Sequence, residues 1–457
     1  MMGQQAGNQD RLFYRFHLDN HVPTDHLLRG IDRFLDLSDL RRHLAAFYSH
    51  TGRPSVDPEL TIRMLIVGYC FGIRSERRLC EEVHLNLAYR WFCRLGLEDM
   101  VPEHSTFSKN RHGRFRDSDA FRHLFESVLQ RCIHEGLVGG EGFAIDASVV
   151  RADASRDRAI AGAELPQRKL DSAQATRAVR EYLAGVDQEA SRRLETERKS
   201  ISLTDPAAEW TCAPGGPAFF AYSTNYLVDV QAGVIVDVEA TSAHRTQEVD
   251  ATRTMIERAE QRFALKPKHL VGDMAYGAAP MLGWLVQDKQ IAPHIPVWDK
   301  SERDDGTFGR SAFTFDAAQN RYECPGGKFL KPSWRVRKKN PFVYHASQYD
   351  CLPCPLKAKC CPHTPNRKIT RSPHEPARDV ARAIAKTDAY RQSRKDRKKV
   401  EMLFAHLKKI LKLDRLRLRG PSGASDEFLL AATAQNLRRM ARWLDWPPPE
   451  RTILASA

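Results

Sequence analysis

The first third of the chain carries apolar residues at the spacing of amphipathic helices. The Asp-Pro-Glu run at residues 57–59 is typical of a helix start, because Pro is tolerated in the first helical turn. Apolar side chains then recur at helical spacing, and a second helix start follows at Ser75. A short basic helix is predicted after His104. The pattern therefore predicts a mostly helical region over residues 20–135.

Beyond Gly139 the helical spacing gives way to apolar runs of strand length. Residues 142–150 are predicted to form a buried strand that contains Asp146, and residues 219–230 and 233–240 to form a hairpin. Helices and strands then alternate at 247–264, 269–272, 281–287 and 291–297. Three strands followed by this alternation predict an α/β fold with the element order of a ribonuclease-H-like domain, interrupted after its first and last strands.

Two stretches cause these interruptions. Residues 151–218 are polar and charged. After Trp298 the chain is irregular and rich in Gly, Pro and Cys up to about residue 371. Because this second stretch has few long apolar runs, we expect that it can hardly build a core of its own. Helices are predicted again over residues 375–412 and 426–444.

The charge balance narrows the class of partner. The 457 residues carry a formal net charge of +14, and 12 Lys and Arg residues fall between Tyr390 and Gly420 against 3 Asp and Glu. Such a concentrated excess favours a polyanionic partner, nucleic acid before an anionic membrane. No run of 18 apolar residues occurs, and the N-terminus lacks the apolar stretch of a signal peptide. A cytoplasmic protein without a membrane span is expected.

One acid, Glu401, lies inside the most cationic segment. On a helix, Arg397 four residues before it and Lys408 seven residues after it share its side. An apolar stripe runs beside them, formed by Val400, Leu403, Phe404, Leu407 and Leu411. A site that cuts phosphodiester bonds needs a carboxylate for a divalent metal and cations for phosphates. A solvated basic helix with one salt bridge would have the same pattern.

Two further acids lie at positions of the predicted sheet that suit a catalytic site. Asp146 lies inside the first strand, where an unpaired carboxylate is costly to bury, and Asp273 ends a later strand, where sites form in open α/β sheets. Carboxylate oxygens suit hard divalent ions such as Mg²⁺. Taken singly, a strand Asp is more often structural, and Asp229, Asp237 and Glu239 compete for the role. Two strand acids combined with one acid on a basic helix favour a catalytic site.

These segments resemble the signature segments of insertion-sequence transposases of the Asp-Asp-Glu (DDE) class, in the retroviral-integrase superfamily. The resemblance covers about residues 15–445 and is carried by Phe143-Ala-Ile-Asp146-Ala-Ser, Val271-Gly-Asp273-Met-Ala-Tyr276-Gly and Arg397-x3-Glu401-x6-Lys408. The last segment matches the Arg, Glu and Lys of the Tyr-Arg-Glu-Lys signature in one large branch. Arg394 stands where that signature has Tyr, and Tyr390 lies one helical turn away.

The resemblance implies metal-dependent cleavage at transposon ends, followed by transfer of the freed 3′-hydroxyl into target DNA. Asp146, Asp273 and Glu401 would bind two Mg²⁺ or Mn²⁺ ions per active site. The implied partners are double-stranded DNA, as terminal inverted repeats and as target, and a second copy of the chain in a homodimer on DNA. The implied location is the bacterial nucleoid. Contacts to DNA phosphates are expected from Arg394, Arg397, Lys408, Lys409 and Tyr276.

Five of the ten cysteines lie between residues 324 and 361. The Cys351-x2-Cys354 spacing is usual for two ligands of one tetrahedral zinc ion, and a structural Zn²⁺ would stabilise a segment without a core. Free thiols in a loop are the alternative. The candidate zinc ligands are Cys324, Cys351, Cys354 and Cys360 (or Cys361), and His363 is a substitute ligand.

The expected organisation follows from these features. It comprises a helical N-terminal DNA-binding domain at 1–138, a ribonuclease-H-like catalytic domain formed by 139–302 and 372–445, a Cys-rich insertion at 303–371 and a flexible tail at 446–457. A DNA-binding regulator derived from an inactive transposase is an alternative, but it would not need the three acids. A ribonuclease-H-like nuclease that cuts without joining is a second alternative, and the sequence does not separate it from a transposase.

Overall fold

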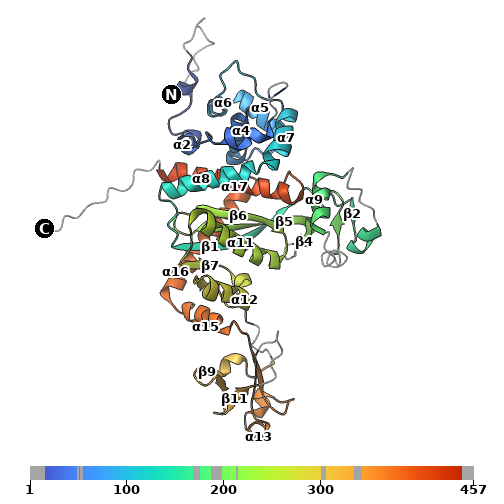
Figure 1. The fold of residues 1–457 in the computed structure, drawn as a ribbon, viewed down its shortest axis with the longest axis vertical. Helices are drawn as coiled ribbons and strands as arrows, with labels where there is room; N and C mark the ends of the chain where they lie inside the picture. Colours follow the sequence, from blue (N-terminus) through green and yellow to red (C-terminus); the bar gives the residue numbers. More distant parts are fainter. Residues whose placement is uncertain are drawn as a thin grey trace, which may run out of the picture.

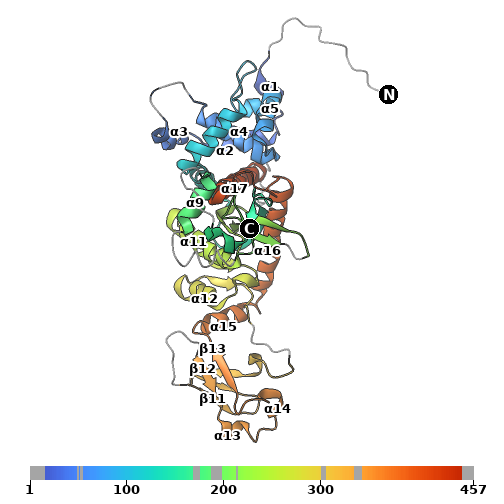
Figure 2. The same ribbon diagram turned by 90° about the vertical axis from the view of Figure 1, so that its right-hand side faces the viewer.

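The structure is a computed structural model. It describes residues 16–48, 51, 55–167, 175–186, 198–212, 215–299, 305–333 and 342–444. The predicted tail at 446–457 lies outside these residues, as do parts of both predicted insertions. Figures 1 and 2 show an elongated molecule with the N-terminal helices at one end, a sheet in the middle and a second, smaller sheet at the other end.

The N-terminal region is helical, as the spacing of its apolar residues predicts. Helix α4 (Pro58–Phe71) begins where the Asp57 carboxylate accepts a hydrogen bond from the Glu59 amide at 2.7 Å, and it ends at Gly72 with a φ of 68°. Ser75 caps the next helix, as predicted. The surrounding helices are α1 (Leu18–His21), α2 (Leu27–Phe34), α3 (Leu40–Leu44), α5 (Glu76–Leu85), α6 (Leu87–Phe92), α7 (His104–Asn110) and α8 (Ala120–His134).

The central sheet combines antiparallel and parallel pairing. Its strands are β1 (Gly142–Arg151), β4 (Glu209–Cys212), β5 (Ala218–Asp229), β6 (Ile235–Ser242), β7 (His269–Val271) and β8 (Ala292–His294). β5 pairs antiparallel with β1 and β6, whereas β7 runs parallel to both β1 and β8. The order across the sheet is therefore β6-β5-β1-β7-β8, with β4 pairing the first residues of β5. This mixture of helices and sheet agrees with the predicted α/β class.

Helix α17 (Gly420–Leu444) joins the N-terminal helices to the central sheet. It contacts α2, α4 and α8 on one side and β6 on the other (Figure 1). Two ion pairs with little exposure hold it, Arg74 with Glu427 and Arg116 with Asp426 at 2.7 Å. One cluster of buried apolar side chains runs from the N-terminal helices through the central sheet to α17. The N-terminal helices therefore share a core with the sheet.

The remaining helices pack around the sheet. α11 (Arg245–Phe263) contacts β5 and β6, α9 (Arg177–Val186) contacts α17, and α12 (Ala279–Gly283) contacts α15 (Glu375–Ile384). The helix predicted over 375–412 is two helices, because α16 (Asp388–Lys409) starts anew after α15. The break occurs at Thr387, whose extended backbone interrupts the helix and whose side chain accepts a hydrogen bond from the Tyr390 amide.

The Cys-rich segment is not irregular, so two expectations about it are wrong. It forms an antiparallel sheet of five strands and packs a small core of its own. The strands are β9 (Thr314–Asp316), β10 (Arg321–Glu323), β11 (Phe329–Pro332), β12 (Phe342–His345) and β13 (Lys368–Arg371). The core residues are Phe313, Tyr322, Leu330, Tyr344, Ala346 and Ile369. Because these residues are widely separated in the sequence, no apolar run in the sequence predicts this core.

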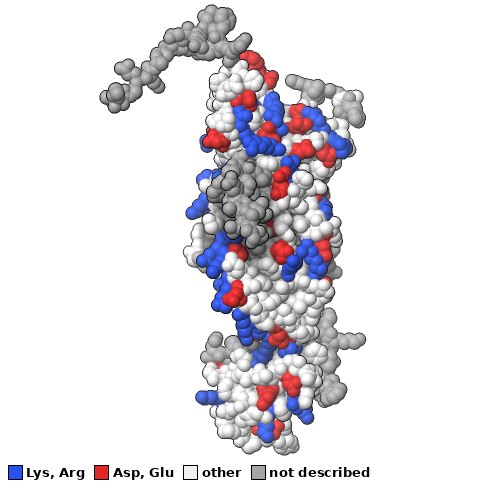
Figure 3. All heavy atoms as spheres, turned by 90° about the vertical axis from the view of Figure 1, so that its left-hand side faces the viewer, with Lys and Arg blue, Asp and Glu red and all other residues white. Residues whose placement is uncertain are grey.

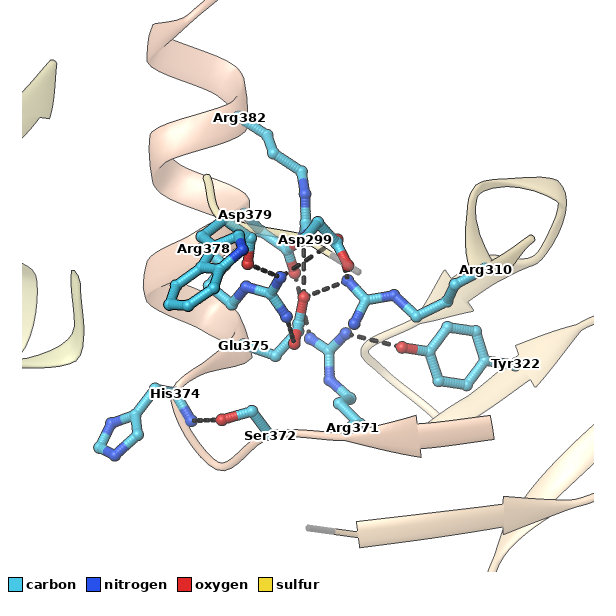
Figure 4. A network of polar contacts seen from close by, with 11 residues as sticks. Asp299, Arg310, Tyr322, Arg371, Ser372, His374, Glu375, Arg378, Asp379 and Arg382 are labelled. Atoms are coloured by element: carbon cyan, nitrogen blue, oxygen red, sulfur yellow. Dashed lines mark hydrogen bonds and ion pairs between the residues drawn. The ribbon is translucent and has the colours of Figure 1, made fainter. Parts of the chain in front are cut away.

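A network of charged side chains ties this second sheet to α15 (Figure 4). The fully buried Glu375 carboxylate pairs with Arg310, Arg378 and Arg382. On the other side of the junction, Arg371 donates to the Tyr322 hydroxyl at 3.0 Å. Buried ion pairs with several hydrogen bonds fix geometry more than they add stability. The network therefore sets the orientation of the second sheet against the helix that leads into α16.

Both signs of charge occur on the surface of the central region. Figure 3 shows Lys and Arg gathered along the left-hand edge of the middle of one face, with Asp and Glu scattered between them. Within the described residues, no helix is both long enough and apolar enough to cross a membrane.

Candidate active site

The pairing of β1 with β7 brings two of the predicted acids together. Ala144 lies opposite Val271 in these parallel strands. Asp146 and Asp273 each come two residues further along, so the register leads to neighbouring positions at one edge of the sheet. Burial raises the pKa of the Asp146 carboxyl above its usual value; Arg397 opposes this shift and the negative charge of Asp273 adds to it. The two carboxylates therefore lie close enough for their negative charges to interact.

Helix α16 carries the third acid over the same part of the sheet. Its apolar stripe is buried at Val400, Leu403 and Leu407, as the spacing predicts. The ring of Phe404 packs on the ring of Tyr226, with centroids 5.4 Å apart. Tyr226 of β5 is the cross-strand partner of Asp146, so this packing holds α16 across the face of the sheet that carries the Asp146 side chain.

Arg397 lies between the helix acid and the strand acid. Its Nη2 atom is 3.5 Å from Asp146 Oδ2 and 4.0 Å from Glu401 Oε1. The Glu401 side chain is 59% exposed. One guanidinium therefore bridges the two carboxylates, and their oxygens are no further apart than the sum of those two distances.

The side chains of the three acids are not arranged as a metal site in this structure. In the part of the chain that the structure describes, no group of three or more His, Cys, Asp or Glu side chains is arranged to hold a metal ion. The Arg397 guanidinium lies between Asp146 and Glu401 and neutralises part of their charge.

The predicted phosphate-binding side chains differ in accessibility. Arg394 and Lys409 are exposed on α16. Lys408 Nζ donates to the Val149 carbonyl of β1 at 3.0 Å, and burial lowers its pKa. Tyr276 is only 2% exposed, which disfavours a direct contact with a DNA phosphate. The exposed cations of α16 are therefore better placed for DNA than Tyr276.

One partly buried acid of the central region was not singled out by reasoning from the sequence. Glu248, in the first turn of α11, accepts a hydrogen bond from the Ser223 hydroxyl of β5 at 2.8 Å. The only signal in the sequence is an acid at the start of the helix that follows the third strand. Because many surface helices begin with an acid, that signal is weak.

The five cysteines of the second sheet line one cavity. The Lys328 amide donates to the Cys324 sulfur at 3.3 Å, and a side chain added at Gly326 would touch the sulfurs of both Cys324 and Cys354. Burial raises the pKa of Cys360 to about 11, and the neighbouring Cys361 adds to the shift. These thiols are gathered, but within the described residues they are not arranged as ready ligands of one ion.

Comparison with known families identifies the class. Residues 16–113 match the transposase domain DUF772, and residues 323–441 match a transposase DDE domain. No curated protein and no solved structure matches the chain significantly. The two family matches show that the chain is an insertion-sequence transposase of the DDE class, an enzyme whose partner is DNA. Glu401, Arg397 and Lys408 lie inside the second match, whereas Asp146 and Asp273 lie between the two.

The buried position of Asp146 leads to a prediction for the metal-free protein. Because the pKa of Asp146 is raised in the folded state, its contribution to stability is present at low pH and is lost as pH rises through that pKa. The Asp146→Asn variant carries no such charge, so it should have the higher Tm at pH 7, and the difference should shrink toward pH 3. Thermal melts in chelator across this range measure it. A wild type that melts above the variant at pH 7 would contradict the prediction.

Proposed function

We propose that the enzyme cleaves DNA at the ends of its transposon and transfers the freed strand into target DNA, with Asp146, Asp273 and Glu401 as the catalytic carboxylates. The observation that carries the proposal is the meeting of two strand acids from β1 and β7 under a helix that presents Glu401 and Arg397. A protein that only binds DNA does not need acids beside its basic residues, because these acids would repel the DNA phosphates. A structural protein does not need them either.

The strand order supports a ribonuclease-H-like catalytic domain made of residues 139–302 and 372–445. In the sheet order β6-β5-β1-β7-β8 the strands β6, β5 and β1 pair antiparallel, and β7 and β8 join them in parallel. The central strand then carries Asp146, and its parallel neighbour leads into Asp273. The second sheet would be an insertion between β8 and α15, and residues 1–138 would be a DNA-binding domain that shares the core of the catalytic domain.

The donor set fits hard divalent cations. Asp146, Asp273 and Glu401 supply carboxylate oxygens, and among the described residues Arg397 is the one cation that forms ion pairs with them. When bound, a pair of Mg²⁺ or Mn²⁺ ions would activate the attacking oxygen and stabilise the leaving oxygen of an in-line phosphoryl transfer. Asp146 and Asp273 would hold these ions from the sheet, and Glu401 would close the site from α16.

The basic side chains of α16 would hold the DNA. Arg397, once released from the two carboxylates, would bind a phosphate next to the scissile bond, and exposed Arg394 and Lys409 would hold phosphates further away. Lys408 would exchange the Val149 carbonyl for a phosphate. Cleavage and joining need no protein nucleophile, because water attacks in the first step and a DNA 3′-hydroxyl in the second. Joining two transposon ends implies a homodimer on DNA.

End cleavage tests this function directly. Purified protein is incubated in Mg²⁺ with duplexes that carry the terminal inverted repeat of its element, and with shuffled duplexes as controls. We expect nicks at the repeat boundary that liberate a 3′-hydroxyl, and none in chelator. Binding of the repeat without any nick, in either Mg²⁺ or Mn²⁺, would favour a DNA-binding regulator.

The cysteine-lined cavity would hold one structural Zn²⁺. Thiolates are the preferred ligands of zinc, and the amide hydrogen bond to Cys324 stabilises a thiolate. We expect about one zinc ion per chain in the purified protein. The Cys354→Ser variant should lose zinc and become sensitive to proteolysis in the second sheet, whereas Cys212→Ser, an exposed cysteine outside it, should do neither. Metal analysis that finds no stoichiometric zinc in the wild type would favour free thiols.

A further inference from the structure

A buried polar pair joins the N-terminal half of α16 to the central sheet. The Nδ1 atom of His294, the last residue of β8, and the Oγ atom of Ser393 on α16 share a hydrogen bond of 2.6 Å. His294 is 8% exposed and Ser393 is 4% exposed. A hydrogen bond between buried groups is costly to lose, because water cannot replace the missing partner. The pair therefore fixes the place at which α16 meets β8.

Two further rings pack near the imidazole of His294. The ring centroid of His269 lies 4.7 Å from it, and that of Tyr390, which is on the same helix as Ser393, lies 6.2 Å from it. Burial lowers the pKa of His294 to about 4, and His269 adds to this shift. His294 is therefore neutral near pH 7, and its bond to Ser393 joins two uncharged groups.

An uncharged partner suits this part of α16, because cations crowd it. Six basic residues lie within two turns of Ser393, namely Arg391, Arg394, Lys395, Arg397, Lys398 and Lys399. A cation at position 294 would repel them, and a carboxylate there would compete with DNA phosphates for them. A neutral hydrogen bond attaches the helix to the sheet without engaging its cations.

Other polar contacts of α16 with the central region are made by side chains that DNA attracts. Lys399 Nζ donates to the Val230 carbonyl at 3.2 Å, and Lys408 Nζ donates to the Val149 carbonyl at 3.0 Å. DNA phosphates compete with these carbonyls for the two ammonium groups. The bond between His294 and Ser393 is uncharged and buried, so DNA does not compete for it.

Each member of the pair is linked by regular structure to a proposed catalytic acid. On α16, Glu401 follows Ser393 by about two turns, so the two side chains lie on the same side of the helix. On the sheet, His294 is the parallel partner of Val271, and Asp273 follows Val271 by two residues. A shift of α16 at Ser393 would therefore move Glu401 relative to the strand that leads into Asp273.

We infer that Ser393 and His294 are positioning residues for DNA cleavage, and that their hydrogen bond sets the place of Glu401 over the sheet. The inference rests on the proposed function, since it concerns how the same catalytic acids are held. Neither residue touches the reacting atoms. Their loss should therefore lower the rate of cleavage without weakening DNA binding, because the cations of α16 remain.

The test varies the hydroxyl at position 393. Ser393→Ala removes the hydroxyl and Ser393→Thr keeps it, while Ser118→Ala removes a buried hydroxyl of the N-terminal region and serves as the control. Single-turnover cleavage of a terminal-repeat duplex in Mg²⁺, at saturating enzyme, measures the rate. Fluorescence anisotropy in chelator measures DNA affinity, thermal melts measure Tm, and hydrogen exchange of residues 391–404 measures the attachment of α16.

We expect Ser393→Ala to cleave at least about tenfold more slowly, with unchanged DNA affinity and faster hydrogen exchange in α16. Ser393→Thr should recover the rate, and Ser118→Ala should cleave as the wild type does. His294→Phe should slow cleavage as much as Ser393→Ala, and the double variant should be no slower than either single variant.

Wild-type cleavage by Ser393→Ala, in an assay where Asp146→Asn is inactive, would overturn the inference and leave the proposed function standing. A Ser393→Ala variant that loses DNA affinity and Tm along with its cleavage rate would show a role in folding alone, which also overturns the inference. A wild-type enzyme that does not cleave its terminal repeat would reject the proposed function, and the inference with it.

Discussion

Replacing Asp146 with Asn, or Glu401 with Gln, is expected to slow cleavage of the transposon end by about 10³-fold or more while the same DNA is still bound. Both substitutions remove a negative charge and keep the shape of the side chain. The loss therefore falls on metal binding and on the charge that develops during phosphoryl transfer. Single-turnover cleavage in Mg²⁺ measures the rate, and fluorescence anisotropy in chelator measures DNA binding.

A neighbouring acid provides the matched control for Glu401. Asp396 lies on the same helix and pairs with Lys399 at 3.0 Å, and no ion pair joins it to Arg397. The Asp396→Asn variant should therefore cleave at the wild-type rate. Wild-type cleavage by either Asp146→Asn or Glu401→Gln would show that the catalytic residues are wrongly assigned. Equal losses in all three variants would point to weakened DNA binding by α16 instead.

Replacing Glu427 with Gln is expected to destabilise the whole protein by about 3–5 kcal/mol, the largest effect on stability that we predict. Glu427 is fully buried, pairs with the buried Arg74, and accepts hydrogen bonds from the Arg417 and Leu418 amides at 2.6 Å. The neutral variant leaves the Arg74 cation buried without a counter-charge. Because this pair joins α17 to the N-terminal helices, Tm and the urea midpoint should fall together.

An exposed ion pair in the same region provides the comparison. Arg78 and Glu82 lie one helical turn apart on α5, with Arg78 69% exposed. Glu82→Gln should cost no more than about 0.5 kcal/mol, because solvent screens the pair. A Glu427→Gln variant no less stable than Glu82→Gln would contradict the role given to this junction. Methionine at both 74 and 427 should recover part of the loss, since it removes both charges together.

Local signals predicted those parts of the fold whose chemistry is local. The carboxylate of Asp57 followed by Pro predicted the start of α4, and the stripe from Val400 to Leu407 predicted the buried face of α16. Strand order brought Asp146 and Asp273 together, because parallel neighbours end at the same edge of a sheet. For the helix start and the apolar stripe, each residue type reports on its own neighbours along the chain.

Features formed by residues that are far apart in the sequence could not be predicted from local sequence patterns. The core of the second sheet joins Phe313, just before β9, to Tyr322 and Tyr344, which lie on strands of three and four residues that are too short for a periodic pattern to show. The buried Glu375 finds its arginine partners on both sides of a junction between two parts of the fold.

The most direct test of the central claim is strand transfer from a pre-cleaved end. A duplex that ends in the terminal repeat with a free, labelled 3′-hydroxyl is incubated with the enzyme, Mg²⁺ and a supercoiled plasmid. We predict that the label becomes covalently joined to the plasmid, that a 3′-deoxy end is not joined, and that Asp146→Asn yields no product. An enzyme that nicks the terminal repeat efficiently yet never joins a free 3′-hydroxyl to the plasmid would contradict strand transfer and indicate a nuclease.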